Sequence, residues 1–205
     1  MVCKISTHEM YSLVNRLNPR VVTYSKKEVI SRSKIGEQRI AIILEGVIYL
    51  SIDNDSFERS ILRCFTKGDF LTQSMLISAG DNISHLVTKK PAKVAYFNRE
   101  KLMEHLLEDK RNVQRVFMLL SGQIEQELLY HSFILHQKTI RTKLMCLFQK
   151  LSAEQQSSRI KLPMPYSDLA DFLGIERTAL MKELSKMKHD GLISGKNREL
   201  DVLIQ

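Results

Sequence analysis

The feature that most constrains the fold is a pair of short amphipathic segments joined by a glycine turn, between residues 166 and 193. Ser167 is expected to cap the first helix, whose leading backbone N–H groups lack partners. Ala170 is small, as the close crossing of a second helix requires, and Gly174 supplies the turn. The apolar anchors of the second helix recur at helical spacing: Leu180, Leu184 and Met187. These residues predict a helix-turn-helix, with Ile175 filling the joint between the helices.

The second helix begins with polar side chains that suit the major groove of DNA. Arginine pairs bidentately with guanine, glutamate accepts from cytosine, and threonine contacts a base edge or the thymine methyl group. The residues expected to read bases are Glu176, Arg177, Thr178 and Lys182. Those expected to hold phosphates or the helix frame are Ser167, Lys186 and Lys188. The alternative is a helical hairpin with a solvated, charged face, but the β-like tail after Asp190 is typical of a wing and favours DNA binding.

The net charge also favours an anionic partner. Lys and Arg outnumber Asp and Glu by 31 to 23, which gives a formal charge of +8. Charge alone does not choose between nucleic acid and a membrane surface. No apolar run approaches the ~18 residues of a membrane span, and the first residues do not resemble a signal peptide. The predicted location is therefore the cytoplasm, where Cys3, Cys64 and Cys146 would be reduced thiols.

Short segments rich in β-branched and aromatic residues fill the first half of the chain. They predict strands at Val21–Tyr24, Glu28–Ile30, Arg39–Leu44, Val47–Ile52, Ser60–Phe65, His85–Thr88 and Lys93–Phe97. Strands this short and regularly spaced are typical of a sandwich or small barrel. Gly46 is expected at a hairpin bend, although a lone glycine in a strand also fits a bulge.

A helical region follows the strands, because glycine and proline are nearly absent from residues 99–151. Asn98 is a plausible N-cap for a short first helix. Beyond Asp109 an apolar stripe continues for about seven helical turns. We expect this stripe to form a dimer seam through Val113, Phe117, Leu120, Ile124, Leu128, His131 and Leu135. The alternative is an internal core helix. A further helix is expected at Thr139–Leu151, then a loop at Ser152–Arg159.

Three motifs resemble the Crp-Fnr family of bacterial regulators. The winged helix of that family is similar to Asp168–Leu180 together with Glu183–Ile193. Its strand-Gly-strand signature is similar to Ala41–Leu50, and its Gly-Asp turn is similar to Lys67–Leu71. The resemblance implies an α+β fold with an N-terminal double-stranded β-helix, a jelly-roll barrel like that of cyclic-nucleotide-binding domains. A long dimerisation helix and a C-terminal winged helix-turn-helix follow. The corresponding domains are residues 1–109, 110–137 and 138–205.

The sequence departs from the nucleotide-binding members of that family. The Gly-Asp-Phe turn is followed by Thr72, Gln73 and Ser74 in place of the ribose-binding glutamate segment. Ile83 and Ser84 stand where an arginine would take the cyclic phosphate, so a buried anion would lack its charged partner. Lys89 and Lys90 are near enough to substitute, but a solvated turn is the simpler reading. The expected effector pocket comprises Phe70, Leu71, Thr72, Gln73, Ser74, Ile83 and Ser84, and its effector is unknown.

The residues do not favour a cofactor or an enzyme. Three cysteines are too few for a Cys-ligated [4Fe–4S] cluster, and His85 is the sole barrel histidine, where a haem or cupin-like metal site would need more. RNA binding would need an aromatic stacking platform, and the chain has no Trp. The prediction is a homodimeric, sequence-specific regulator of transcription that binds a palindromic DNA operator, with RNA polymerase as a further partner. The alternative is an interaction module whose helix-turn-helix does not bind DNA.

Overall fold

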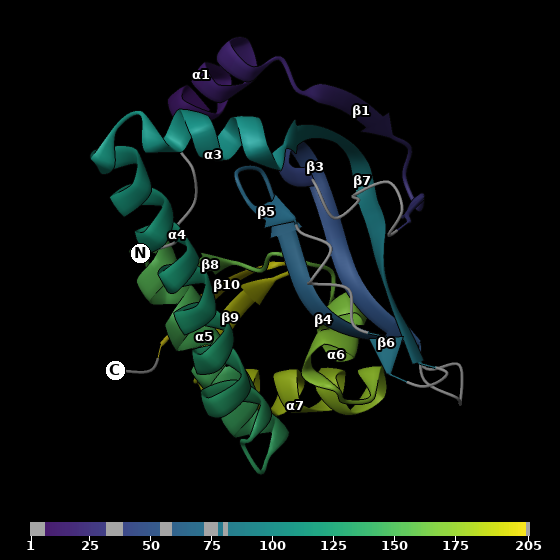
Figure 1. Ribbon diagram of the computed structural model, residues 1–205. Coiled ribbons are helices and arrows are strands. Elements are labelled where there is room, and N and C mark those ends of the chain that lie inside the picture. The colour runs from purple at the N-terminus through teal and green to yellow at the C-terminus, as the bar shows by residue number, and fades with distance from the viewer. Residues whose placement is uncertain (1–6, 32–38, 54–58, 72–77, 80–81, 204–205) are drawn as a thin grey trace. The chain divides into compact units, whose positions relative to one another are not determined.

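The computed structural model describes residues 7–31, 39–53, 59–71, 78–79 and 82–203, shown in Figure 1. Within these ranges, side chains are described except at 7, 39, 53, 78, 79, 82, 83, 119, 120, 123, 124 and 126–132. The chain forms two compact units, residues 3–121 and residues 122–205, and the division along the sequence falls within a long helix. Each unit is considered by itself below.

An antiparallel sheet makes up most of the first unit. Its described strands are β1 (Arg20–Tyr24), β2 (Val29–Ile30), β3 (Arg39–Asp53), β4 (Arg59–Thr66), β5 (Phe70–Leu71), β6 (Ser78–Ala79) and β7 (Asn82–Asn98). The order is β1-β7-β3-β4, with β2 and β6 paired to β7 and β5 paired to β3. The long strands β3 and β7 pair from Arg39↔Asn98 to Ile52↔Ser84. This arrangement confirms the predicted N-terminal β-domain and shows that its strands are antiparallel.

Two predicted strand breaks are wrong. Arg39–Leu44 and Val47–Ile52 form one strand, β3, and His85–Thr88 and Lys93–Phe97 form one strand, β7. Gly46 is a bulge residue in β3, with φ of +99° and register shifts on both sides of it. A Cβ at this position would lie 2.4 Å from the carbonyl oxygen of Pro91. Glycine therefore allows β7 to approach closely, so the bulge alternative is confirmed and the hairpin bend is not.

One face of the sheet encloses an apolar core. Its members include Tyr24, Ile30, Phe65, Leu71 and Leu86, of which Tyr24, Phe65, Leu71 and Leu86 have no exposed surface. The hydroxyl groups of Tyr24 and Tyr96 lie 2.6 Å apart and satisfy each other inside this core. Large side chains therefore fill this part of the interior of the β-domain.

Helices cover the other face of the sheet. Leu13 and Val14 of α1 (Thr7–Leu17) and Leu102 of α3 (Arg99–Leu107) pack in a second cluster, which also contains Ile42 and Phe70. The Asn98 side chain accepts a hydrogen bond from the Lys101 N–H at 3.1 Å, which confirms the predicted N-cap. The predicted long helix is also confirmed, since α4 (Lys110–Leu129) continues into a π-helical segment, Tyr130–Leu135.

The second unit contains a helical hairpin and a small sheet. Its further elements are α5 (Ile140–Gln155), β8 (Arg159–Lys161), α6 (Tyr166–Leu173), α7 (Arg177–His189), β9 (Ile193–Lys196) and β10 (Glu199–Val202). The sheet order is β8-β10-β9, so the predicted β-like tail after Asp190 is confirmed and forms a hairpin of β9 and β10. The predicted loop at Ser152–Arg159 is wrong at both ends. Ala153, Glu154 and Gln155 favour helix and extend α5, which ends at the left-handed Gln156 (φ +50°), and Arg159 begins β8.

Candidate nucleic-acid interface

The turn between α6 and α7 has the predicted geometry. Gly174 ends α6 in the left-handed conformation, with φ of +62°, and its N–H donates to the Ala170 carbonyl. The Ile175 N–H donates to the same carbonyl at 3.1 Å, and the Ile175 side chain is half-buried. The predicted anchors of α7 are all buried: Leu180, Leu184 and Met187. The apolar side of α7 therefore faces its own unit, and its polar side faces solvent.

The predicted capping role of Ser167 is wrong. Helix α6 begins at Tyr166, and Pro165 occupies the N-cap position with φ of −62° and no side-chain hydrogen bond. Because the proline ring fixes φ near this value, the chain enters the helix earlier than the serine suggests. Ser167 lies inside the first turn, where it is exposed and its Oγ donates to Asp168 Oδ1 at 3.5 Å.

The start of α7 brings the four predicted base-reading residues onto one exposed stretch. Glu176 occupies the N-cap position, and the Thr178 hydroxyl donates to its Oε2 at 3.2 Å. Arg177 and Lys182 are exposed, and among the described residues no hydrogen bond or ion pair engages either side chain. Two long cations and a polar pair are therefore available to a ligand within two helical turns.

The predicted phosphate contacts differ in their surroundings. Lys186 is exposed on the last turns of α7. Lys188 is also exposed, but its Nζ donates to the Gly195 carbonyl at 2.8 Å. Lys188 therefore ties the end of α7 to the β9–β10 hairpin as well as adding positive charge.

Arg141 of α5 fixes the orientation of α7 from outside the motif. Its Nε lies 2.5 Å from Glu183 Oε1, and its Nη1 lies 2.7 Å from Asp190 Oδ2. The hydrogen bond from Arg141 lowers the pKa of Asp190, and the bonds to Glu183 and Asp190 raise the pKa of Arg141. No pattern in the sequence indicates this role, because Arg141 is separated from Glu183 by 42 residues.

The small sheet of β8, β9 and β10 adds cations that the sequence argument missed. A hollow of about 440 Å³ is lined by Arg159, Lys161, Lys196 and Arg198, together with Glu199 and Asp201. Arg159 pairs with Glu199 at 3.1 Å. The Tyr166 hydroxyl donates to the Asn197 carbonyl and connects the hairpin tip to α6. The signal that could have found this group is the density of basic residues around the predicted wing turn.

The residues predicted for a dimer seam and an effector pocket are only partly described. Val113 and Phe117 of α4 are 41% and 69% exposed, and Leu135 is half-buried. The side chains of Leu120, Ile124, Leu128 and His131 lie outside the described part of the chain. Leu71 and Ser84 are buried, whereas Phe70 lies on the opposite face of the sheet from Leu71. Thr72, Gln73, Ser74 and the Ile83 side chain are outside the described residues.

Comparison with known proteins identifies the C-terminal motif. Residues 142–205 match the family model of the Crp-like helix-turn-helix domain. The chain has the Crp/Fnr fold and carries a Crp-like helix-turn-helix domain. Among curated proteins, no sequence matches this chain. None of the described helices is long and apolar enough to cross a membrane.

Solved structures share this Crp/Fnr fold over nearly the whole chain. A CooA mutant from Carboxydothermus hydrogenoformans has a TM-score of 0.73 at 15% identity, covering 98% of this chain and 94% of that one. A cyclic nucleotide-binding domain containing protein from Listeria monocytogenes has a TM-score of 0.76 at 14% identity, with coverage of 96% and 95%. TTHB099, a CRP-family transcriptional regulator from Thermus thermophilus, has a TM-score of 0.60 at 16% identity, covering 89% of this chain and 92% of that one. At these identities the likeness establishes the fold.

Proposed function

We propose that this protein is a sequence-specific regulator of transcription that binds a palindromic operator as a homodimer. The observation that carries the proposal is that Glu176, Arg177, Thr178 and Lys182 are all exposed at the start of α7, whereas the anchors of the helix are buried. In a helix-turn-helix the second helix enters the major groove with its N-terminal residues at the base edges. We propose that these four residues contact the bases. Ser167 of α6 and Lys186 and Lys188 of α7 would contact the phosphates.

Two substitutions separate base reading from phosphate binding. Genomic fragments selected with the wild-type protein would supply the preferred site. Arg177→Ala should cost about 1–3 kcal/mol on that site and relax its selectivity there. Lys186→Ala should weaken binding to every sequence by a similar factor and reduce the salt slope by about one. Unchanged sequence preference in Arg177→Ala would contradict the assignment and favour the alternative, an interaction module without DNA binding.

The homodimer is proposed from the exposed apolar residues of α4. Two half-sites of an operator lie about 34 Å apart, and a dyad places two recognition helices at that spacing. Val113 and Phe117 lead the stripe that continues in sequence through Leu120, Ile124, Leu128, His131 and Leu135. Exposed apolar side chains in such a row are typical of a helix that pairs with its own copy.

The dimer seam can be tested with two substitutions on one helix. Phe117→Glu would place like charges at the proposed seam, so light scattering should find a monomer and DNA affinity should collapse. Met118 is 66% exposed but lies about 100° around the helix from Phe117. Met118→Glu should therefore remain dimeric. A dimeric Phe117→Glu protein would place the interface elsewhere, with the β-domains as the next candidate.

We further propose that cyclic nucleotides do not control this regulator. The support is the sequence itself, which has Ile83 where the nucleotide-binding members of the family have arginine. A ligand at 100 times its Kd would add about 2.7 kcal/mol to the stability of the form that binds it. Millimolar cyclic AMP or cyclic GMP should therefore leave the melting temperature unchanged, and a clear rise with either would overturn this part of the proposal.

A further inference from the structure

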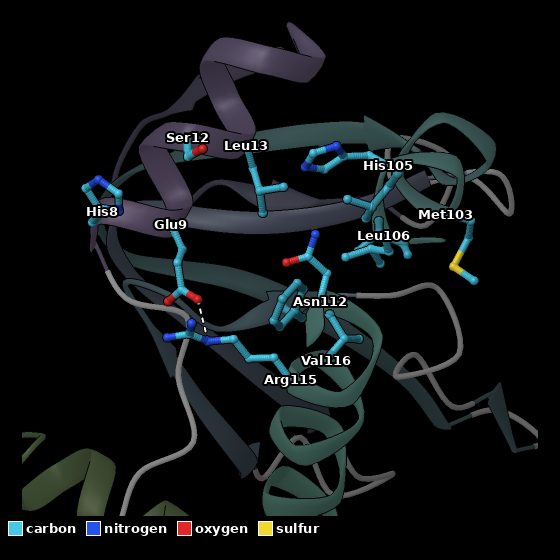
Figure 2. Close-up of a pocket in the computed structure, with 13 residues that line it drawn as sticks. His8, Glu9, Ser12, Leu13, Met103, His105, Leu106, Asn112, Arg115 and Val116 are labelled. Carbon is cyan, nitrogen blue, oxygen red and sulfur yellow. Dashed lines mark ion pairs between the residues drawn. The ribbon is translucent and has the colours of Figure 1, made fainter. Parts of the chain in front are cut away.

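A pocket of about 390 Å³ lies on the helical side of the first unit, outside the enclosed core of the sheet. Helices α1, α3 and α4 surround it, and the sheet contributes Ile40 and Phe70 to its wall (Figure 2). Its apolar lining consists of Leu13, Ile40, Phe70, Leu102, Met103, Leu106 and Val116. This volume falls within the range of small-molecule sites in proteins.

The pocket is distinct from the interior to which the family resemblance assigns an effector. Phe70 and Leu71 are neighbours in β5, so their side chains point to opposite faces of the sheet. Leu71 belongs to the enclosed core with Tyr24 and Leu86, whereas Phe70 packs with Leu102 and lines the pocket. A molecule bound here would therefore contact none of the core side chains around Leu71.

The polar residues that line the pocket come from all three helices: His8, Glu9 and Ser12 from α1, His105 from α3, and Asn112 and Arg115 from α4. Arg115 Nε pairs with Glu9 Oε1 of α1 at 2.5 Å, which neutralises both charges. Among the described residues, no hydrogen bond engages the Nη groups of Arg115 or the side-chain amide of Asn112. In Figure 2 the Asn112 amide points into the space between Leu13 and Leu106. The Asn112 amide thus points into the pocket with no protein acceptor, and Arg115, whose side chain is 64% exposed, adds N–H donors beside Glu9.

We propose that this pocket binds a small amphipathic molecule with an apolar body and one oxygen-bearing head group, a carboxylate or an amide. The head group would accept from the Asn112 amide and the Arg115 Nη groups, and the body would pack on Leu13, Phe70 and Leu106. At about 30 Å³ for a water-sized group, 390 Å³ accommodates about a dozen non-hydrogen atoms. Because Glu9 already balances Arg115, the head group does not need a negative charge, and a cationic head group would find no unpaired anion.

The site couples three helices through one ligand. Glu9 and Leu13 belong to α1, Leu106 to α3, and Asn112 and Arg115 to α4. Helix α4 is covalently continuous with the unit that carries the Crp-like domain. A ligand that holds the start of α4 would therefore act on the same helix that we propose as the dimer seam. Binding itself is independent of the proposed function, so it can be tested without DNA.

The test uses isothermal titration of the full chain with decanoate and decanamide, each below its aggregation concentration. Both have about a dozen non-hydrogen atoms. Decyltrimethylammonium has an alkyl chain of similar length and a cationic head group, so it serves as the control. We expect one site per chain for decanoate, decanamide or both, and at least tenfold weaker binding of the cation. Comparable binding of all three would indicate nonspecific apolar adsorption and would overturn the proposal, as would absence of binding by both the acid and the amide.

Two tryptophan variants locate the site. Leu106 lines the pocket, and Leu107 is its neighbour on α3 with 67% exposure and no place in the lining. Leu106→Trp should fill the pocket and abolish binding, whereas Leu107→Trp should bind like the wild type. Binding that survives Leu106→Trp would overturn the assignment. So would a changed oligomeric mass in Leu106→Trp alone, since a second chain would then be the occupant.

The head-group contact has its own variant, which also applies if Leu106→Trp does not fold. Asn112→Leu removes the amide while keeping a similar size. Because one hydrogen bond contributes about 0.5–1.5 kcal/mol, the affinity should fall about three- to tenfold. Unchanged affinity in a folded Asn112→Leu protein would contradict the proposed orientation of the ligand.

Discussion

The sheet of the first unit and the helical hairpin of the second unit are stabilised over different distances along the chain. In the sheet, β3 pairs with β7 through Arg39↔Asn98, and β1 pairs with β7 through Arg20↔Tyr96. In the hairpin, the turn is closed by contacts a few residues apart: the Ile175 N–H donates to the Ala170 carbonyl and the Leu180 N–H to the Glu176 carbonyl. The difference shows that local spacing can specify a binding motif, whereas the pairing of β7 with β3 and β1 depends on partners 32 to 76 residues apart.

Gly46 in the sheet and Gly174 in the hairpin give this comparison a direct test. We expect substitution of Gly46 to cause the larger loss of stability. A Cβ at Gly46 would meet the Pro91 oxygen at 2.4 Å and Ala92 Cα at 2.6 Å, at a φ of +99°. Overpacking costs about 1–3 kcal/mol and the left-handed conformation about 1–2 kcal/mol. Gly46→Ala should therefore destabilise the protein by about 2–5 kcal/mol. Thermal unfolding measures the loss, and hydrogen exchange should show it in β3 and β7 amides; intact protection there would contradict the proposed clash.

The matched substitution in the hairpin should have a smaller effect. Gly174 has φ of +62°, but a Cβ there would meet no atom within 4 Å. Gly174→Ala should therefore cost only about 1–2 kcal/mol, the conformational term alone. The increase in hydrogen exchange should be confined to α6 and α7. A loss as large as that of Gly46→Ala would mean that the turn is more crowded than the structure shows.

The smallest expected effect is a pH dependence confined to the second unit. Arg141 holds the pKa of Asp190 below its usual value of 3.8. Because the folded pKa is the lower one, this contribution to stability is present above about pH 4 and is lost as the pH falls through the folded value. Asp190→Asn should flatten the fall in melting temperature in this acid range.

Glu154→Gln is a suitable control for the acid titration, since Glu154 is an exposed carboxylate of α5 that forms no ion pair with any of the described residues. It should retain the acid dependence of the wild type. Equal flattening in both variants would show that the Arg141 contact does not produce the effect.

The sequence predicted the hairpin better than its surroundings, for a physical reason. Gly174, Ile175 and the anchors of α7 act within a few residues of one another, so their spacing carries the information. The prediction that Ser167 caps α6 is wrong because Pro165 occupies the N-cap position and the helix begins at Tyr166. Arg141 could not be found from spacing, since its partners Glu183 and Asp190 are close to it only in the folded unit.

In the first unit the sequence predicted strand composition but not strand length. Gly46 was expected at a bend because a glycine within a strand pattern fits a bend and a bulge equally well. Only the approach of Pro91 and Ala92 on β7 distinguishes them. The pocket beside Phe70 was not predicted at all, because its lining comes from α1, α3, α4 and two strands at once. Such a site depends on tertiary packing and leaves no local pattern.

The most direct test of the central claim compares the affinity of the purified protein for its selected operator and for a shuffled sequence of the same length at one salt concentration. The proposed role of Arg177 and its neighbours predicts that the operator binds about 10³-fold more tightly or better, as specific DNA-binding proteins do. Equal affinity for the two DNAs would contradict sequence-specific recognition by α7.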